Sequence, residues 1–338
     1  GGISAFGLLL VAFVHSQWQF WMIFGVFGGI LGAGPDAVLT GAIVPKWFIR
    51  KRGRASALAS MGTGLAAFIM PLVVPPFVSA FDWRTAFIAL GANTLLLGVL
   101  PAFLLRTRPE DVGLRPDGDA ARTVGAVSRT PEISFTAKEA FRTTTLWLII
   151  AAALFGSFSP TAFPANLTPT WVSRGYSLKV AGWGFAAYGF TSFTGRFFWG
   201  WLADKLHIRH TLIIICIYTG LTVPLLHFLP GNATLTAGAI AGFGIGAWVG
   251  LNQVIYATYF GRENLGAIMG TVRPMITVSS GTGPTIIAAM ADITGGYGAG
   301  IVMMTVSWWI CAVLLSRVPP IKAGKVPRPA PAAQAPRH

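Results

Sequence analysis

Long apolar stretches alternate with short polar breaks along the whole chain. We place ten stretches, at residues 1–15, 19–45, 55–80, 84–105, 146–171, 179–203, 211–229, 234–258, 267–291 and 298–316. A helix needs roughly 20 apolar residues to cross about 30 Å of hydrocarbon. The stretches lack the two-residue alternation of barrel strands, so we predict membrane helices. The expected fold class is an all-α polytopic membrane protein.

Composition supports this interpretation. Of the 338 residues, 54% are hydrophobic and 11% are charged, whereas a soluble domain carries about 25% charged residues. This balance excludes a water-soluble enzyme and a disordered chain. The two cysteines, Cys216 and Cys311, lie in apolar stretches and indicate no disulfide framework.

One long polar segment divides the chain. Residues 106–145 are rich in Arg, Asp, Pro and Gly. They separate four expected helices (1–105) from a six-helix bundle (146–318). Residues 319–338 are rich in Pro and Ala, which predicts a disordered tail.

The positive charge is distributed unevenly between the breaks. The chain has 25 Lys and Arg against 11 Asp and Glu. When the breaks are placed alternately on two sides of a membrane, 20 cations fall on one side. The other side holds Arg84, Arg174 and Lys179. The positive-inside rule then predicts a cytoplasmic central segment and C-terminus in a plasma (inner) membrane. Nucleic-acid binding is not needed to explain the charge.

Part of the sequence recurs. Gly32–Gly34 and Trp47-Phe48 match Gly244–Gly246 and Tyr259-Phe260 at a spacing of 212 residues. At this spacing the two stretches within 146–203 have no counterpart in the chain. Because transporters are often built from repeats, we expect an N-terminally truncated protein with ten of twelve helices in a six-plus-six arrangement. A natural ten-helix protein is the alternative.

Three polar motifs carry a family resemblance. They are Gly200-Trp201-Leu202-Ala203-Asp204-Lys205, Pro45-Lys46-Trp47-Phe48 with Arg52-Gly53-Arg54-Ala55, and the segment from Arg108 to Pro116. These motifs and their order along the chain resemble the major facilitator superfamily, and within it the monocarboxylate transporters and oxalate/formate-type antiporters. The resemblance implies two bundles that alternate around a central site. We expect cytoplasmic gating loops at Asp204, Lys205, Arg50, Arg52 and Arg262.

Arg196 is the first of two cations inside predicted spans. It lies eight residues before Asp204, about 12 Å along a helix. A buried arginine is costly and is usually paired or facing a cavity, and its planar fork suits a carboxylate. We therefore predict a substrate-carboxylate anchor; a structural ion pair and snorkelling to the headgroups are the alternatives. The resemblance implies the same role, since monocarboxylate transporters use an arginine of the eighth helix. They carry an aspartate one turn earlier, where this chain has Ser192.

Three further residues are candidates. Arg273 is the second cation within a span and precedes Pro274; it is a substrate contact or a snorkelling side chain. Asn252 lies mid-span and lines a cavity or joins helices. Asp36 is the only acidic residue in the first four spans; it carries protons or neutralises an arginine.

These residues predict a secondary transporter of small organic anions, mono- or dicarboxylates, by proton symport or anion exchange. The alternatives are an efflux carrier for neutral or hydrophobic solutes and a non-transporting membrane sensor. The sequence shows no metal spacing, P-loop or nucleophile–base arrangement. We therefore expect no enzymatic activity, cofactor or metal. The expected partners are the anion, protons and lipid, with a monomeric protein.

Overall fold

The computed structural model describes residues 2–30, 43–48, 51–104, 106, 109–112, 135–261 and 264–319. These residues form helices and no strands, which confirms the predicted all-α class. Asp36, Arg50 and Arg262, most of the central polar segment and the tail lie outside the described residues.

The part of the chain before residue 113 forms short and long helices. They are α1 (Gly2–Val11), α2 (Gln17–Ile23), the π-helix η1 (Phe24–Ile30), α4 (Val44–Trp47), α5 (Arg52–Ala59), α6 (Met61–Ala80), α7 (Trp83–Thr94), the π-helix η3 (Leu95–Val99), and the 3-10 helices η4 (Pro101–Leu104) and η5 (Pro109–Val112). The predicted span 55–80 is thus two helices that meet at Ser60.

The rest of the chain is built mainly from long helices. They are α8 (Ala137–Phe141), α9 (Thr144–Ser173), α10 (Leu178–Lys205), α11 (Ile208–Thr222), α12 (Leu225–Phe228), α13 (Ala233–Phe260), α14 (Leu265–Thr294) and α15 (Gly298–Arg317). The predicted break between 229 and 234 is present, but α12 forms within the predicted span 211–229.

The expected central loop ends earlier than predicted. Thr136 and Glu139 form a reciprocal capping box that starts α8, and Thr143 caps α9 through the amide of Leu146. These side chains satisfy backbone amides that a helix start leaves without partners. The described part of the segment 106–145 therefore includes the short helices η5 and α8 and the first residues of α9.

Five helical stretches of the described residues are long and apolar enough to cross a membrane. They are Arg52–Ala80, Thr144–Ser173, Ile208–Phe228, Ala233–Phe260 and Gly298–Arg317. α10 and α14 have similar lengths, 28 and 30 residues, but are less apolar. The two arginines within predicted spans, Arg196 and Arg273, lie on these two helices.

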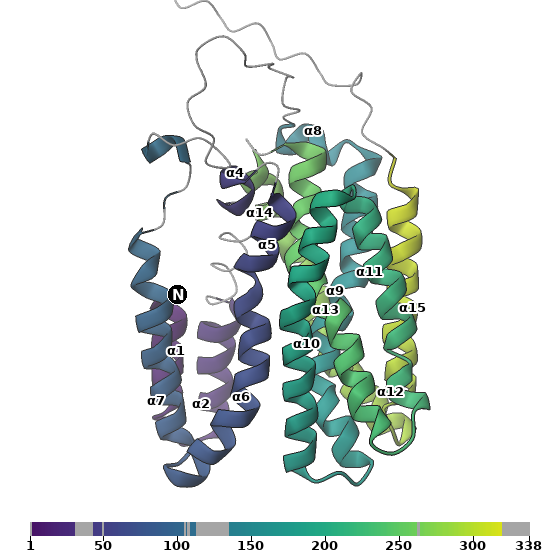
Figure 1. The fold of residues 1–338 in the computed structure, drawn as a ribbon. Coiled ribbons are helices and arrows are strands. Elements are labelled where there is room, and N and C mark those ends of the chain that lie inside the picture. Colours follow the sequence, from purple (N-terminus) through teal and green to yellow (C-terminus); the bar gives the residue numbers. More distant parts are fainter. Residues whose placement is uncertain are drawn as a thin grey trace, which may run out of the picture.

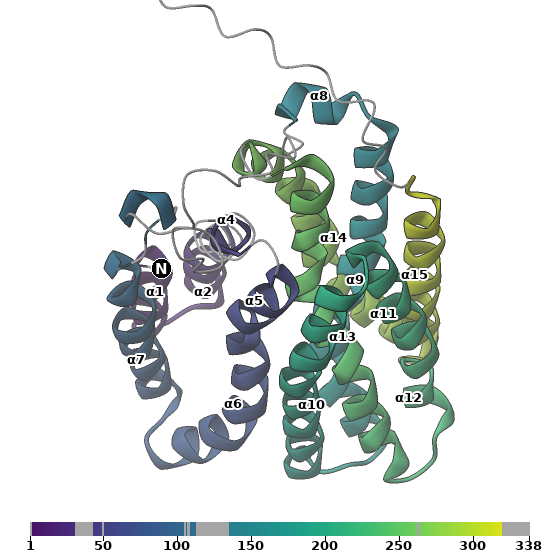
Figure 2. The ribbon, with the colours of Figure 1, turned by 45° about the horizontal axis from the view of Figure 1, so that its top comes forward.

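The helices form two bundles. Figure 1 places α1, α2, α6 and α7 in a first bundle and α9, α10, α11, α13, α14 and α15 in a second. α5 and α6 run along the boundary and pack against α10. Seen from the tilted direction of Figure 2, α5 still lies beside α10 and α13.

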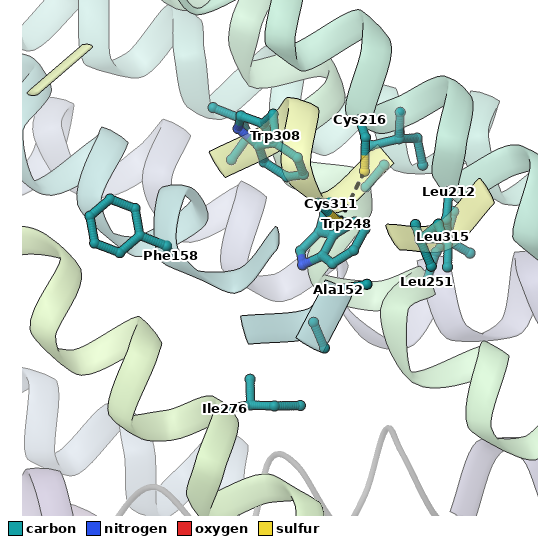
Figure 3. Packing of buried hydrophobic residues seen from close by; sticks show 14 of the residues in the cluster. Ala152, Phe158, Leu212, Cys216, Trp248, Leu251, Ile276, Trp308, Cys311 and Leu315 are labelled. Carbon is teal, nitrogen blue, oxygen red and sulfur yellow. Dashed lines mark hydrogen bonds between the residues drawn. The ribbon is translucent and has the colours of Figure 1, made fainter. Parts of the chain in front are cut away.

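The second bundle holds the large apolar core. Trp248 of α13 and Trp308 of α15 are buried and meet edge to face, with ring centroids 5.3 Å apart (Figure 3). Beside them the thiols of Cys216 and Cys311 lie 3.4 Å apart between α11 and α15. The cysteines behave as the small apolar residues that their sequence context predicted.

Close backbone approach fixes α10 against α13. A Cβ atom at Gly195 would meet the carbonyl oxygen of Phe243 well inside van der Waals contact. That same carbonyl accepts a hydrogen bond from Trp199 Nε1 at 3.0 Å. Small residues allow this approach where lipid supplies no hydrophobic force between helices. α10 is thereby held in a fixed register on the second bundle.

We predict that Gly195→Ala lowers the thermal stability of the purified protein in detergent, because backbone atoms of Phe243 cannot move aside. Gly182→Ala is the matched control on the same helix, since a Cβ there meets nothing within 4 Å. It should leave the melting temperature unchanged or raise it, because alanine favours helix by about 1 kcal/mol. Equal losses in the two variants would contradict the packing argument.

Candidate functional site

The candidate site lies where α6 of the first bundle crosses α10 of the second. Gly189 of α10 approaches the backbone of Ala67 and Phe68, and Gly64 of α6 approaches the backbone of Phe193. At this level the backbones of the two helices approach closely, and the rings of Phe68 and Phe190 also meet across the boundary, with centroids 5.6 Å apart. Arg196 lies one turn further along α10, on the face that meets α6.

The Arg196 side chain is enclosed at this crossing. Only 2% of its surface is exposed. Its Nη1 donates to the carbonyl oxygen of Ser192 at 2.7 Å and to Ser192 Oγ at 2.9 Å. Its Nη2 donates across the bundle boundary to Thr63 Oγ1 at 2.7 Å. The guanidinium is therefore held by α10 itself and by one hydroxyl of α6.

Those partners are all neutral oxygen atoms. Within the described part of the chain, Arg54 forms an ion pair with Asp204, and no carboxylate pairs with Arg196. A guanidinium has five N–H donors, and the Nε–H of Arg196 is buried without a hydrogen-bond partner. Arg196 is thus a desolvated cation with part of its donor capacity unused, and the alternative of a structural ion pair finds no partner for it among the described residues.

Gly64 makes room for this arrangement. A Cβ at position 64 would collide with Arg196 Nη1 and with the backbone of Phe193. The Nη1 end of the guanidinium therefore lies close to the α6 backbone at this position. Any side chain at Gly64 would displace either the arginine or the helix.

Asp204 joins the bundles at the end of α10. Its Oδ1 accepts from the Gly53 amide at 2.7 Å and its Oδ2 accepts from the Arg54 amide at 3.3 Å. Arg54 Nε lies 3.4 Å from Oδ2. These amides open α5, whose N-cap residue Lys51 provides no side-chain cap. A carboxylate at a helix N-terminus satisfies the free amides and the positive end of the helix dipole.

The two helices separate at the opposite end. There α6 and α10 leave a cleft of about 540 Å³, lined by Pro71, Leu72, Pro75, Pro76, Ser79, Leu178, Lys179, Gly182 and Trp183. Figure 1 shows α6 bending away from α10 toward Ala80. Prolines remove backbone hydrogen bonds and bend helices, and three of them occupy this part of α6. The bundles are therefore in contact at the Asp204 end and apart at the Pro76 end.

The remaining candidates lie elsewhere. Arg273 is half-buried in α14. Asn252 is half-buried on α13. The hydrogen bonds of Arg196 reach neither of them, although α10 and α14 both pack on α9 and α13.

The charged residues near the Asp204 end have local roles. Lys205 lies over the Trp201 ring, 4.2 Å from its centroid. Arg52 Nε donates to the Phe48 carbonyl oxygen at 3.1 Å. Asp36, Arg50 and Arg262, lying outside the described residues, stay predictions.

Sequence reasoning missed Thr63 as part of the site. A threonine within an apolar helix ordinarily bonds its own backbone, and Thr63 Oγ1 does donate to the Ser60 carbonyl oxygen at 2.9 Å. The one sequence feature that could have pointed to Thr63 is its neighbour Gly64, a small residue within an apolar span. Nothing in the sequence pairs that span with α10.

Comparison with known proteins decides the family. The model of the Major Facilitator Superfamily matches residues 1–174 and 157–337, which together cover nearly the whole chain. The chain belongs to the Major Facilitator Superfamily. The predicted superfamily is therefore confirmed, and its fold and relatives are those of membrane transporters.

Curated members of this superfamily extend the likeness. Monocarboxylate transporter 12 of Xenopus laevis is 27% identical over 336 residues, covering 93% of this chain and 72% of the relative. Monocarboxylate transporter 12 of Homo sapiens is 25% identical and also matches 93% of this chain, which spans 65% of its length. An MFS-type transporter of Gibberella moniliformis is 26% identical over 87% of this chain and 67% of its own.

Solved structures share the facilitator fold. The transporter FucP in an outward conformation gives a TM-score of 0.66 at 14% identity, covering 95% of this chain and 81% of that one. A bacterial homologue of the iron transporter ferroportin gives 0.63 at 13% identity, with coverage of 94% and 80%. These likenesses establish the architecture.

We predict that Asp204→Ala destabilises the facilitator more than Arg54→Ala. The first variant leaves two α5 amides without an acceptor, a loss of about 0.5–2 kcal/mol. The second removes an ion pair whose Arg54 side chain is 49% exposed, and such pairs contribute about 0–1 kcal/mol. Thermal unfolding of both purified variants measures the difference. Equal destabilisation would mean that the ion pair, and not the cap, joins the helices.

The environment of His207, near the same end of α10, predicts that the stability of the protein depends on pH. Burial lowers its pKa below 6.5, and the charges of His210 and Arg209 lower it further. His207 caps α11 by accepting from the Arg209 amide at Nδ1, 3.3 Å away. The unfolded chain binds this proton more readily, so stability should fall as the pH drops below about 6.5.

Melting temperatures at pH 7.5 and 5.5 test this expectation. His207→Asn keeps an N-cap side chain without the titration, so it should reduce the pH difference. Replacing the exposed His15 by asparagine is the control and should leave the difference as in the unaltered protein. A difference that persists in His207→Asn would assign it to another group.

Proposed function

We propose that the protein is a secondary transporter of small organic anions, mono- or dicarboxylates, that works by alternating access. The observation that carries the proposal is the guanidinium of Arg196, 2% exposed and surrounded by neutral oxygens among the described residues. Coupling is by proton symport or by anion exchange.

The electrostatics of Arg196 favour an anionic ligand. Removing an ion from water costs several kcal/mol after relaxation, and the three hydrogen bonds recover only part of that. A carboxylate would supply the missing negative charge and two aligned acceptors. The buried, unpartnered Nε–H is one donor available to it.

The arrangement of the bundles supports alternating access. Among the described residues, contact between α5 and α10 at the Asp204 end and a cleft between α6 and α10 at the Pro76 end form the asymmetry expected of an alternating-access carrier. We propose that the Asp204 end is cytoplasmic, since it collects most of the cations, and that the protein resides in the plasma (inner) membrane.

The relatives support the same class of substrate. Several of them are named monocarboxylate transporters. Arg273 and Asn252 are proposed as further substrate contacts, and Asp36 as a proton carrier or a charge partner. Asp204, Lys205, Arg50, Arg52 and Arg262 are proposed to form the cytoplasmic gate.

A second candidate function has one observation in its favour. The cleft is lined mainly by proline, leucine and tryptophan side chains, which suits a neutral or hydrophobic solute. Such a carrier would gain nothing from an unpaired guanidinium at the crossing. The anion carrier therefore explains more of the site.

We predict that Arg196→Gln abolishes carboxylate uptake into proteoliposomes, because the variant removes the charge and the fork. Arg196→Lys keeps the charge without the fork, so its KM should rise at least about tenfold. Labelled pyruvate and succinate are the probes, and size-exclusion profiles check folding. Unaltered uptake by Arg196→Gln would rule out the anchor and favour the carrier of neutral solutes.

Arg273→Ala is assayed beside these variants. A substrate contact predicts a raised KM, whereas full activity would reduce Arg273 to a structural side chain. Tight binding of the probes without flux in the unaltered protein would favour the sensor alternative.

A further inference from the structure

We infer that Thr63 is the resident acceptor that ties Arg196 across the two bundles until the transported anion displaces it. The inference rests on the proposed anion transport and deepens it, because it names the residue through which binding of the anion loosens α6 from α10. Thr63 is a positioning residue and acts through Arg196.

Thr63 can meet Arg196 only as a hydrogen-bond acceptor. Its hydroxyl hydrogen goes to the Ser60 carbonyl oxygen of its own helix at 2.9 Å. The oxygen therefore faces Arg196 as an acceptor only, at 2.7 Å from Nη2. A hydroxyl with its single hydrogen already used is well suited to hold a cation and unsuited to donate to an anion.

Of the three hydrogen bonds that Arg196 makes to described residues, only the one to Thr63 depends on how close the bundles are. Both bonds to Ser192 lie within α10 and move with the arginine. The bond to Thr63 requires α6 to stay in contact, as the collision expected for a Cβ at Gly64 shows. Separation of the helices at this level breaks that bond and leaves the other two intact.

A carboxylate competes with Thr63 for the N–H donors of the Arg196 guanidinium. The Nε–H and one Nη2–H of a guanidinium share an edge, and a carboxylate binds such an edge through two parallel bonds. At Arg196 the Nε–H on this edge is buried and has no partner. A carboxylate on that edge takes Nη2, the nitrogen that also binds Thr63, as its second donor, so the two acceptors compete for this nitrogen. The carboxylate is the stronger acceptor, because it brings a full negative charge and two aligned oxygens, whereas Thr63 offers one neutral oxygen.

This competition couples binding of the anion to the separation of α6 from α10. A ligand shifts a conformational equilibrium only through its different affinity for the two states. The empty carrier must break the bond between Arg196 and Thr63 to part α6 from α10, whereas the loaded carrier has already exchanged it. Loaded carriers should therefore reorient faster, and anion exchange should exceed net anion flux.

The test uses Thr63→Val, which keeps the shape of the side chain and removes the acceptor. In proteoliposomes with labelled pyruvate, the half-saturation concentration should fall about three- to tenfold, the worth of one hydrogen bond. The ratio of exchange to net flux should fall toward one, because the empty carrier is no longer tied. Thr63→Ser should restore both values.

Thr194→Val is the matched control. Thr194 lies on α10, is partly exposed, and bonds the Phe190 and Thr191 carbonyls of its own helix. It loses the same kind of backbone bond as Thr63→Val without touching the boundary, so both values should match the unaltered protein. Size-exclusion profiles confirm that each variant folds.

Two outcomes would overturn the inference and leave the proposed function standing. A weaker affinity with an unchanged flux ratio would make Thr63 a direct ligand of the anion. Unchanged affinity and ratio would make its bond to Arg196 incidental. Failure of the proposed function has a different signature, since Arg196→Gln would then keep its uptake of the probes.

Discussion

A guanidinium removed from water needs acceptors, and the neighbourhood of Arg196 is organised around that requirement. Ser192 supplies two oxygens from the same helix and Thr63 supplies one from the other bundle. Gly64 leaves the space in which the charged plane lies against α6. The charge remains uncompensated by any described carboxylate, and the proposed anion site at the crossing of α6 and α10 depends on this feature.

The polar contacts between described residues of the two bundles include two of very different kinds. At the end of α10, Asp204 binds the free amides of α5, and this contact depends on a formal charge meeting a helix terminus. Midway along the helix, a neutral hydroxyl accepts from Arg196. The first contact suits a stable closed end, whereas the second is the one that the proposed anion would replace. Backbone contact at Gly189 places both polar contacts in register.

The sequence predicted the elements that depend on local pattern and missed those that depend on which helices meet. Apolar length indicated the helical spans, charge asymmetry predicted their orientation, and the cost of burying an arginine singled out Arg196 within one of them. The break at Ser60 and the helix α8 depend on a few individual residues, which the hydrophobic pattern cannot reveal. Thr63 was missed because its role exists only through the pairing of α6 with α10, a contact between residues 133 positions apart.

The thiols of Cys216 and Cys311 have a practical consequence. Both side chains are completely enclosed between α11 and α15, 3.4 Å apart (Figure 3). A bulky or charged maleimide has no route to either sulfur in the folded state. The two natural cysteines should therefore not react in a thiol-labelling experiment on the folded protein. A single cysteine introduced along the cleft or beside Asp204 would report solvent access at that position without removal of the natural pair.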